Sequence, residues 1–363
     1  MTNWRPISLL NVDYKIATKA INNRIKKVLP NIISHEQSGF IKGRYIGENV
    51  RVIFDIIEHL EETNEPGLLF FADFAKAFDS LSHRYIVDCI TSLNFGPNMV
   101  NWIKLFYNDI QSVIINNGHM SQSFRLQKGV RQGCPLSATL IIICLQSLSN
   151  HITLNEEIKG IKINNKEIKQ TLFADDSTFF NNGDKHSFET LIKTLELFSK
   201  CSGLTLNTKK STILRVGSLK QSNLQFCKSK QFIWTSDNAA TLGMTFSNDM
   251  KRNTEINIDK KVKEFKSVLK QWQHRKLTLM GKVSVIKTFA LLKLIYPFTV
   301  LANPNKSVIE EIKKYLFSFI WDEKPNKIKR DILYQKYEQA GLKLTNIEYF
   351  LNSLKAFFYE TIY

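Results

Sequence analysis

The sequence predicts an α+β part over residues 1–249, followed by a basic and mostly helical part from residue 250 onward. The first part mixes the helical period of 3.6 residues with short apolar runs typical of strands, whereas the second part shows helical periodicity alone. The chain has 363 residues, of which 43% are hydrophobic and 23% charged. This is a globular composition, and the length is sufficient for two or three subdomains.

Two amphipathic helices are expected before the first strand. Residues 13–29 place apolar side chains at helical spacing until Pro30, which we expect to end the helix, and residues 48–60 repeat the pattern. Residues 68–71 (LLFF) then form a continuous apolar run, which is typical of a strand buried on both faces.

Hairpins and further helices follow. Asn117-Gly118 lies between residues 112–115 and 123–126, and residues 161–168 form a second candidate hairpin. In the second part, apolar residues recur at helical spacing from Val262 to Trp272. Two more helices are expected over residues 278–296, stopping at Pro297, and over 306–321, stopping near Pro325.

The net charge indicates a polyanionic partner. Lys and Arg number 50 against 33 Asp and Glu, which gives +17, and residues 250–363 hold 22 of the basic residues against 11 acidic ones. Nucleic acid is the first candidate partner and an anionic membrane surface the second. The charge favours a binder of nucleic acid whose helical part is the more basic.

Cysteine usage and hydropathy favour an intracellular protein in the nucleus, the cytoplasm or both. The five cysteines are an odd number without CxxC spacing, which argues against a disulfide framework or a zinc ribbon. The N-terminus lacks the features of a signal peptide. The apolar stretch 285–302 is interrupted by two lysines and Pro297, so we expect a core helix and no membrane contact.

Two adjacent carboxylates lie in residues 171–180 (TLFADDSTFF). The apolar flanks predict two short strands, with Ala174, Asp175 and Asp176 as the turn between them. Adjacent like charges close to a core are costly unless a positive group neutralises them. Mg²⁺ would do so, because it takes oxygen ligands and is often held by one or two carboxylates. The alternative is a solvated turn without a ligand.

A third carboxylate and a glycine-rich turn complete the candidate chemistry. Asp73 follows the buried run 68–71, and catalytic groups often lie at the carboxyl ends of strands; Ser82 would then cap the next helix. Residues 129–137 (GVRQGCPLS) form a turn that opens an apolar helix, with Pro135 expected in its first turn. A nucleotide could bind there. The alternatives are a turn aspartate leaving a strand and a tight turn into a core helix.

Taken together, these motifs resemble those of reverse transcriptases. The central ones run from Asp73 to Phe78, over residues 132–137 (QGCPLS) and over 173–176 (FADD). The FADD form, with residues 5–10 (RPISLL) and 39–44 (GFIKGR), is similar to LINE-type (non-LTR) retrotransposons. Further similarities lie at residues 202–207 with Lys210-Ser211, at Leu242-Gly243, at 277–287 and at 318–321. The resemblance covers nearly the whole chain in collinear order.

The resemblance implies a right-hand polymerase. Residues 1–249 would form the fingers and a palm with an antiparallel sheet, 250–330 a helical basic thumb, and 331–363 the start of a truncated C-terminal helical segment. The implied activity is that of an RNA-directed DNA polymerase, which extends a primer 3′-hydroxyl with deoxynucleoside triphosphates (dNTPs) by two-metal phosphoryl transfer. Its partners would be an RNA template and a DNA primer or target.

The resemblance also assigns roles to single residues. Asp73, Asp175 and Asp176, with the backbone carbonyl of Phe74, would hold two Mg²⁺ ions. Nucleotide contacts would come from Arg5, Gln132, Gly133 and Lys210, the last with Lys209 as its alternative. Leu242 and Gly243 would grip the primer. Phosphates of the duplex would be tracked by Lys260, Lys261, Lys263, Lys266, Lys270, Arg275 and Lys276, although a solvated helix face is the alternative.

Phe78 would distinguish deoxynucleotides from ribonucleotides. The family places a bulky ring five residues after the metal-binding aspartate, where it leaves no room for a 2′-hydroxyl. The alternative is that Phe78 only packs in the core.

The resemblance further leads us to expect a fragment of a longer polyprotein, because LINE-type proteins usually carry an endonuclease upstream and a Cys/His-rich segment downstream. Those other segments would be partners of the chain. Two competing hypotheses stay open. One is a catalytically impaired or domesticated nucleic-acid-binding relic of such an element. The other is an intron-encoded or retron-like reverse transcriptase, which would more often have Tyr in place of Phe173.

Overall fold

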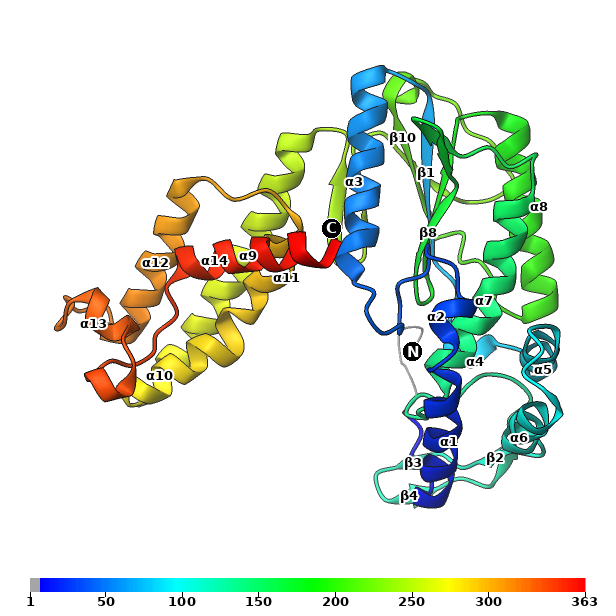
Figure 1. Cartoon of the computed structure of the whole chain (residues 1–363), viewed down its shortest axis with the longest axis horizontal. Coiled ribbons are helices and arrows are strands. Elements are labelled where there is room, and N and C mark those ends of the chain that lie inside the picture. Colours follow the sequence, from blue (N-terminus) through cyan, green and yellow to red (C-terminus); the bar gives the residue numbers. More distant parts are fainter. Residues whose placement is uncertain (1–6, 363) are drawn as a thin grey trace. The chain divides into compact units, whose positions relative to one another are not determined.

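A computed structural model of the protein describes residues 7–362 (Figure 1). The chain divides into two compact units, Met1–Leu242 and Gly243–Tyr363. The first unit mixes helices and strands, and the second is mostly helical. The α+β prediction is confirmed, whereas the assignment of residues 1–249, 250–330 and 331–363 to fingers and palm, thumb and C-terminal segment stays a prediction.

A five-stranded sheet forms the centre of the first unit, in the order β11-β10-β1-β9-β8. β1 (Gly67–Ala72) pairs antiparallel with both β9 (Asp176–Asn181) and β10 (Thr212–Val216). β8 (Gln170–Phe173) pairs antiparallel with β9, and β11 (Ile233–Thr235) pairs parallel with β10. All six residues of β1 are buried, which confirms the strand predicted from the apolar run.

Helices cover both faces of this sheet (Figure 1). α3 (Ile46–Thr63) packs on β8 and β10, and its side chains Ile53, Ile56, Ile57 and Leu60 are completely buried. α7 (Ser137–Leu154) and α8 (Lys185–Ser202) lie on the other face, where the Phe188 ring lies 6.0 Å from the ring of Phe70. The double cover fixes the sheet and the loops at its ends.

Shorter helices surround this centre. They are α1 (Val12–Ile25), α2 (Leu29–Ile32), α4 (Ala77–Ser80), α5 (His83–Ser92), α6 (Pro97–Tyr107) and the 3₁₀ turn Gly217–Leu219. α5 begins as predicted, because the Ser82 hydroxyl accepts a hydrogen bond from the Tyr85 amide. The prediction for Pro30 was wrong: the first helix already ends at Ile25, and Pro30 lies in the first turn of α2, where its missing N–H removes no hydrogen bond.

The predicted hairpins are present as short ladders. β2 (Gln111–Ser112) pairs with β5 (Phe124–Arg125), and β3 (Ile115–Asn116) pairs with β4 (His119–Met120) around the Asn117-Gly118 turn. β6 (Ile161–Ile163) and β7 (Lys166–Ile168) form the other hairpin. Pro135 was expected in the first turn of α7 but lies two residues before that helix begins.

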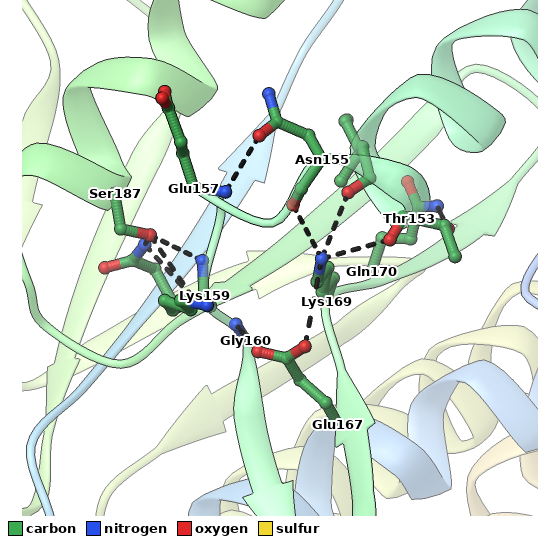
Figure 2. A network of polar contacts seen from close by, with 11 residues as sticks. Thr153, Asn155, Glu157, Lys159, Gly160, Glu167, Lys169, Gln170 and Ser187 are labelled. Atoms are coloured by element: carbon green, nitrogen blue, oxygen red, sulfur yellow. Dashed lines mark hydrogen bonds and ion pairs between the residues drawn. The ribbon is translucent and has the colours of Figure 1, made fainter.

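A half-buried lysine caps the C-terminal end of α7 (Figure 2). Lys169 precedes β8, and its Nζ donates to the carbonyl oxygens of Thr153 at 3.0 Å and Asn155 at 2.9 Å. The last carbonyls of a helix have no partner within the helix and carry partial negative charge. Glu167 lies 3.8 Å from the same Nζ and accepts a hydrogen bond from the Gly160 amide. The network therefore ties α7 to the strand that leads to the Asp175 turn.

Replacing Lys169 by methionine is expected to lower the free energy of unfolding by about 1–3 kcal/mol, because its charge-assisted hydrogen bonds to the last carbonyls of α7 are lost. Only 10% of the Lys169 side chain is exposed. Lys162→Met in the neighbouring β6 is the matched control, since Lys162 is exposed. Denaturant unfolding of both variants measures the difference, and equal losses would contradict the capping role.

The second unit contains β13 (Met244–Ser247) and a set of packed helices. The helices are α9 (Met250–Gln273), α10 (Leu279–Val285), α11 (Leu292–Val300), α12 (Lys306–Trp321), α13 (Arg330–Tyr334) and α14 (Ile347–Ile362), with a π-helical turn at Ile286–Ala290 and a 3₁₀ turn at Tyr337–Gln339. α9 and α12 confirm the predicted helices. Buried Lys282 donates to the Ile320 carbonyl at 3.0 Å and to the Asp322 carboxylate at 2.6 Å, and so joins α10 to the end of α12.

The helix predicted over residues 278–296 is divided into α10, the π-helical turn and α11, and Pro297 lies inside α11. Pro297 has no N–H to donate, but it is buried and its carbonyl accepts from the Leu301 amide at 2.9 Å, so the helix continues past it. Among the described residues α7 is long and apolar enough to cross a membrane, as is the pair α10–α11 if its 44° bend is counted within one span. α7 is 67% buried within the protein.

Candidate active site

The strand register brings Asp73 beside the acidic turn. Ala72 pairs with Ser177, so Asp73 follows β1 one step further along, opposite Asp176. Phe173 pairs with Asp176 across β8 and β9, which leaves Ala174 and Asp175 as the turn. The carboxylates predicted to act together are therefore carried by neighbouring strand ends, although Asp176 already belongs to β9 and not to the turn.

These residues offer oxygen donors, which is the ligand type that Mg²⁺ requires. Asp73 and Asp175 are half-buried and Asp176 is exposed. Within residues 7–362, however, no group of three or more His, Cys, Asp or Glu side chains is gathered closely enough to hold a metal ion. The backbone thus brings the donors to one edge of the sheet, and the assignment of metal binding to Asp73, Phe74, Asp175 and Asp176 stays a prediction.

Asp73 is held by a segment far away in the sequence. The Asn207 side-chain amide donates to Asp73 Oδ2 at 2.9 Å, and the Asn207 backbone N–H donates to the Asp73 carbonyl at 2.8 Å. The Asp73 N–H donates to the Ser211 hydroxyl at 3.1 Å. Lys210 lies in the same turn and is exposed. The sequence had marked residues 202–211 only by resemblance, and it assigned no role to Asn207 or Ser211.

The glycine-rich loop lies against Phe78. The Val130 N–H donates to the Phe78 carbonyl at 2.6 Å. Gly129 has a φ of 90°, and a Cβ at this position would lie 2.8 Å from the Asp79 carbonyl oxygen, so only glycine fits. Gln132 and Phe78 are half-buried and Gly133 is exposed. The structure therefore joins two of the predicted nucleotide-contacting motifs through their backbones.

The N-terminal segment reaches the same loop. The Ser8 N–H donates to the Gln132 carbonyl at 3.0 Å. On α1, the Asn22 side-chain amide donates to the Pro135 carbonyl at 2.8 Å. The Arg131 guanidinium lies 4.8 Å from the Tyr14 ring centre, while burial raises the pKa of Tyr14 to about 12. Arg5, which was predicted to meet the nucleotide, lies outside the described residues.

His83 contacts the backbone of this loop, and burial changes its pKa. The His83 Nε2 lies 2.8 Å from the Gly129 carbonyl oxygen, which can only accept, so this nitrogen carries a proton. Burial lowers the pKa of His83, and the hydrogen bond to Gly129 opposes this effect. His83 therefore supports the loop as a neutral donor.

Three of the seven basic residues predicted to contact phosphates interact with another side chain of the protein. Lys261 pairs with Glu264 at 2.9 Å, and Lys266 pairs with Glu311 of α12. Glu311 is 45 residues from Lys266 in the sequence, so this neutralising partner was not predicted. Arg275 stacks over Trp272 with 4.5 Å to the ring centre. The other four members of the predicted set are exposed: Lys260, Lys263, Lys270 and Lys276.

Leu242 and Gly243 form a tight turn. Their φ angles are 51° and 73°, which is the conformation of a two-residue hairpin turn. They lie between β12 (Asn238–Thr241) and β13, where the two units meet in sequence. The grip on a primer that was predicted for this pair stays a prediction.

Comparison with known proteins identifies the class of this chain. Residues 1–246 match the family model described as Reverse transcriptase (RNA-dependent DNA polymerase), which is more than half of the chain. The chain belongs to the reverse transcriptase family.

Its relatives among curated proteins are encoded by transposable elements. The "Transposon TX1 uncharacterized 149 kDa protein" of Xenopus laevis is 28% identical over 88% of this chain and 24% of its own length. The "Retrovirus-related Pol polyprotein from type-2 retrotransposable element R2DM" of Drosophila melanogaster is 29% identical over 57% of this chain and 19% of its own length. These relatives confirm the predicted resemblance to LINE-type elements. The chain spans about a quarter or less of their lengths.

Solved structures confirm the fold. Telomerase of Candida tropicalis in complex with a fragment of telomeric RNA has a TM-score of 0.52 at 11% identity and covers 96% of this chain and 56% of that one. Apo telomerase of the same species has a TM-score of 0.50 at 12% identity, over 94% of this chain and 54% of that one. At such low identity the likeness concerns the fold alone, and it supports the predicted right-hand polymerase fold.

Proposed function

We propose that this chain is the polymerase part of a LINE-type retrotransposon protein, which extends a DNA primer 3′-hydroxyl with dNTPs on an RNA template. Asp73 and Asp175 would hold two Mg²⁺ ions, with Asp176 and the Phe74 carbonyl as further ligands. Bound divalent metal ions lower the pKa of an attacking hydroxyl and neutralise the leaving pyrophosphate. The observation that supports the proposal most strongly is the register of β1 against β9, which brings Asp73 next to the acidic turn.

The chain's own residues would bind and orient the substrates. The hydrogen bond from the Asn207 side-chain amide orients one carboxyl oxygen of Asp73. Gln132 and Gly133 would line the nucleotide pocket beside Phe78. Phosphates would be contacted by Arg5 and Lys210. Leu242 and Gly243 would hold the primer end. Other segments of a parent polyprotein would supply cleavage and recognition of the target site. The protein would act inside the cell, in the nucleus, the cytoplasm or both.

Primer extension tests the proposal. A DNA primer annealed to an RNA template is incubated with the chain, dNTPs and Mg²⁺, and the product lengths are read on a denaturing gel. Extension that stops when EDTA is added is the expected result. A chain that binds the primer–template but never extends it would contradict the proposal.

That negative outcome would support the second candidate, a catalytically impaired or domesticated nucleic-acid-binding relic. One observation favours it: among the described residues the acidic side chains do not gather into a metal-binding group. The presence of Asp73, Asp175, Asp176, Gln132 and Phe78, which the resemblance to reverse transcriptases leads us to expect at an active site, argues against it.

The exposed lysines of α9 and the lysine paired with Glu311 predict different salt dependences of duplex binding. Lys263 and Lys270 are exposed and seven residues apart on α9, hence on one side of the helix. Replacing both by alanine is expected to reduce the slope of log K against log salt for an RNA–DNA duplex by about 1.5, because each phosphate contact contributes about 0.7–0.9. Fluorescence anisotropy at several salt concentrations measures the slope.

Lys266→Ala is the matched control, since Glu311 already neutralises this lysine. We expect it to change the slope by less than about 0.3, a fraction of one phosphate contact. Equal slopes for the wild type and the double variant would show that this side of α9 is a solvated helix face.

A further inference from the structure

The buried side chain of Gln37 holds the turn that carries Asp175. Its Oε1 accepts from the Ala174 N–H at 2.8 Å and from the Gly39 N–H at 2.8 Å. Its Nε2 donates to the Ala174 carbonyl at 3.2 Å. Gln37 is 1% exposed. One carboxamide thus pairs with both backbone polar groups of Ala174, as a neighbouring strand would.

The backbone around Gln37 extends this pairing along β8. Gln37 and Leu172 form a parallel bridge. The Ser38 N–H donates to the Leu172 carbonyl at 2.9 Å, and the Leu172 N–H donates to the Glu36 carbonyl at 2.7 Å. Residues 36–38 therefore act as an additional strand at the edge of β8. Beyond the end of β8, at Ala174, the Gln37 side chain makes the hydrogen bonds that a paired backbone would otherwise make.

The turn needs such support because its backbone is strained. Ala174 has a φ of 55°, the left-handed conformation that residues with a Cβ rarely adopt. Ala174 is also buried, so an unpaired N–H or carbonyl there would be costly. A Cβ on Gly39 would lie 2.3 Å from the Ala174 nitrogen, which means that the two backbones are in direct contact.

The Gln37 segment is itself anchored to the sheet and to neighbouring loops. The Asn49 side-chain amide donates to the Leu172 carbonyl at 2.8 Å and to the Thr171 hydroxyl at 2.7 Å. The Arg44 guanidinium donates to the carbonyls of Gln37 at 2.6 Å and Ile33 at 2.8 Å. These contacts fix the position from which Gln37 reaches the turn.

We propose that Gln37 is a positioning residue that fixes the backbone of Ala174 and Asp175, and thereby sets the affinity of the acidic site for a divalent metal ion. The inference rests on the proposed function, because it takes Asp175 as a metal ligand. Gln37 touches neither substrate nor metal in this scheme. It acts only through the backbone of the turn.

The test compares Gln37→Met with Gln146→Met. Methionine keeps the length of the side chain and removes its polar atoms. Gln146 is the matched control, because it is also buried and accepts from the Ser34 N–H at 2.9 Å. Its other hydrogen bond, at 2.6 Å, goes to Asn150 on the same helix. Gln146 thus binds the same N-terminal region without touching the turn.

Four readouts separate positioning from general stability. Gln37→Met is expected to speed hydrogen exchange of the amides in residues 172–176 about tenfold and to weaken Mn²⁺ binding, measured by electron paramagnetic resonance, about tenfold, which corresponds to the loss of one or two hydrogen bonds. The Mg²⁺ concentration for half-maximal primer extension should rise to a similar extent. The KM for dNTPs should change less than about twofold, because Gln37 does not contact the nucleotide. Gln146→Met should leave all of these values unchanged.

Equal exchange and Mn²⁺ binding in the two variants would overturn the inference. If Gln37→Met does not fold, Gln37→Asn takes its place, since it keeps the carboxamide but is one methylene too short to reach Ala174, and the same shifts are expected. A wild-type chain without polymerase activity would refute the proposed function alone, because exchange and Mn²⁺ binding still decide the role of Gln37.

Discussion

Replacing Asp175 by asparagine is expected to lower RNA-templated primer extension at least about 10³-fold, because loss of a metal-holding carboxylate removes several kcal/mol of transition-state stabilisation. Asparagine preserves the shape of the side chain and removes only its charge. The expected loss is in kcat, since Asp175 lies in the turn between β8 and β9 and not in the loop of residues 129–137 that would bind the nucleotide. Single-turnover primer extension with saturating dNTPs measures it.

Asp88→Asn is the control for a general effect of removing a carboxylate. Asp88 lies on α5, where its side chain is 64% exposed and 4.0 Å from Arg84. We expect activity close to that of the wild type. The melting temperature of Asp175→Asn should not fall, because the substitution removes a negative charge directly next to Asp176. Activity of Asp175→Asn within tenfold of Asp88→Asn would mean that the acidic turn is not the catalytic centre.

The sequence was sufficient where a local pattern determines the structure. The six-residue strand β1 follows from its continuous apolar run, because a segment that is apolar on both sides must be buried on both sides. The Ser82 cap and the ends of α12 follow from side chains within a few residues of each helix end. The two apolar flanks predicted a turn at Ala174, Asp175 and Asp176, and the structure places Ala174 and Asp175 in the turn and Asp176 in β9.

The sequence was insufficient where a single polar side chain bonds across a long separation. Asn207 and Asp73 are 134 residues apart, and Gln37 and Ala174 are 137 apart. A lone carboxamide has no periodicity and no charge to mark it, so nothing local distinguishes Gln37 from an exposed glutamine. The pairing of Lys266 with Glu311 was missed for the same reason. At Pro297 the local signal was misleading. Proline favours the end of a helix, but burial and packing keep α11 continuous through this residue.

Replacing Phe78 by valine is expected to raise the incorporation of ribonucleotides relative to deoxynucleotides by about 10- to 100-fold, which is the range that a change of pocket size produces. Phe78 is half-buried and packs at the margin of the hydrophobic core, a position compatible with both predicted roles. The Phe78 carbonyl accepts from Val130 whatever the side chain is, so the backbone should stay in place when the ring is removed.

The two roles of Phe78 therefore predict different results for one variant. A ring that only packs would cost about 1–3 kcal/mol of stability on truncation to valine and leave the sugar preference unchanged. A ring that abuts the nucleotide sugar would change the ratio of kcat/KM for ribonucleotides to that for dNTPs, even after correction for the folded fraction. Phe106→Val, a buried phenylalanine on α6 with no proposed contact to nucleotide, measures the packing cost alone. An equal sugar preference in Phe78→Val and Phe106→Val would assign Phe78 to the core, whereas a shift in Phe78→Val alone would place its ring against the incoming nucleotide.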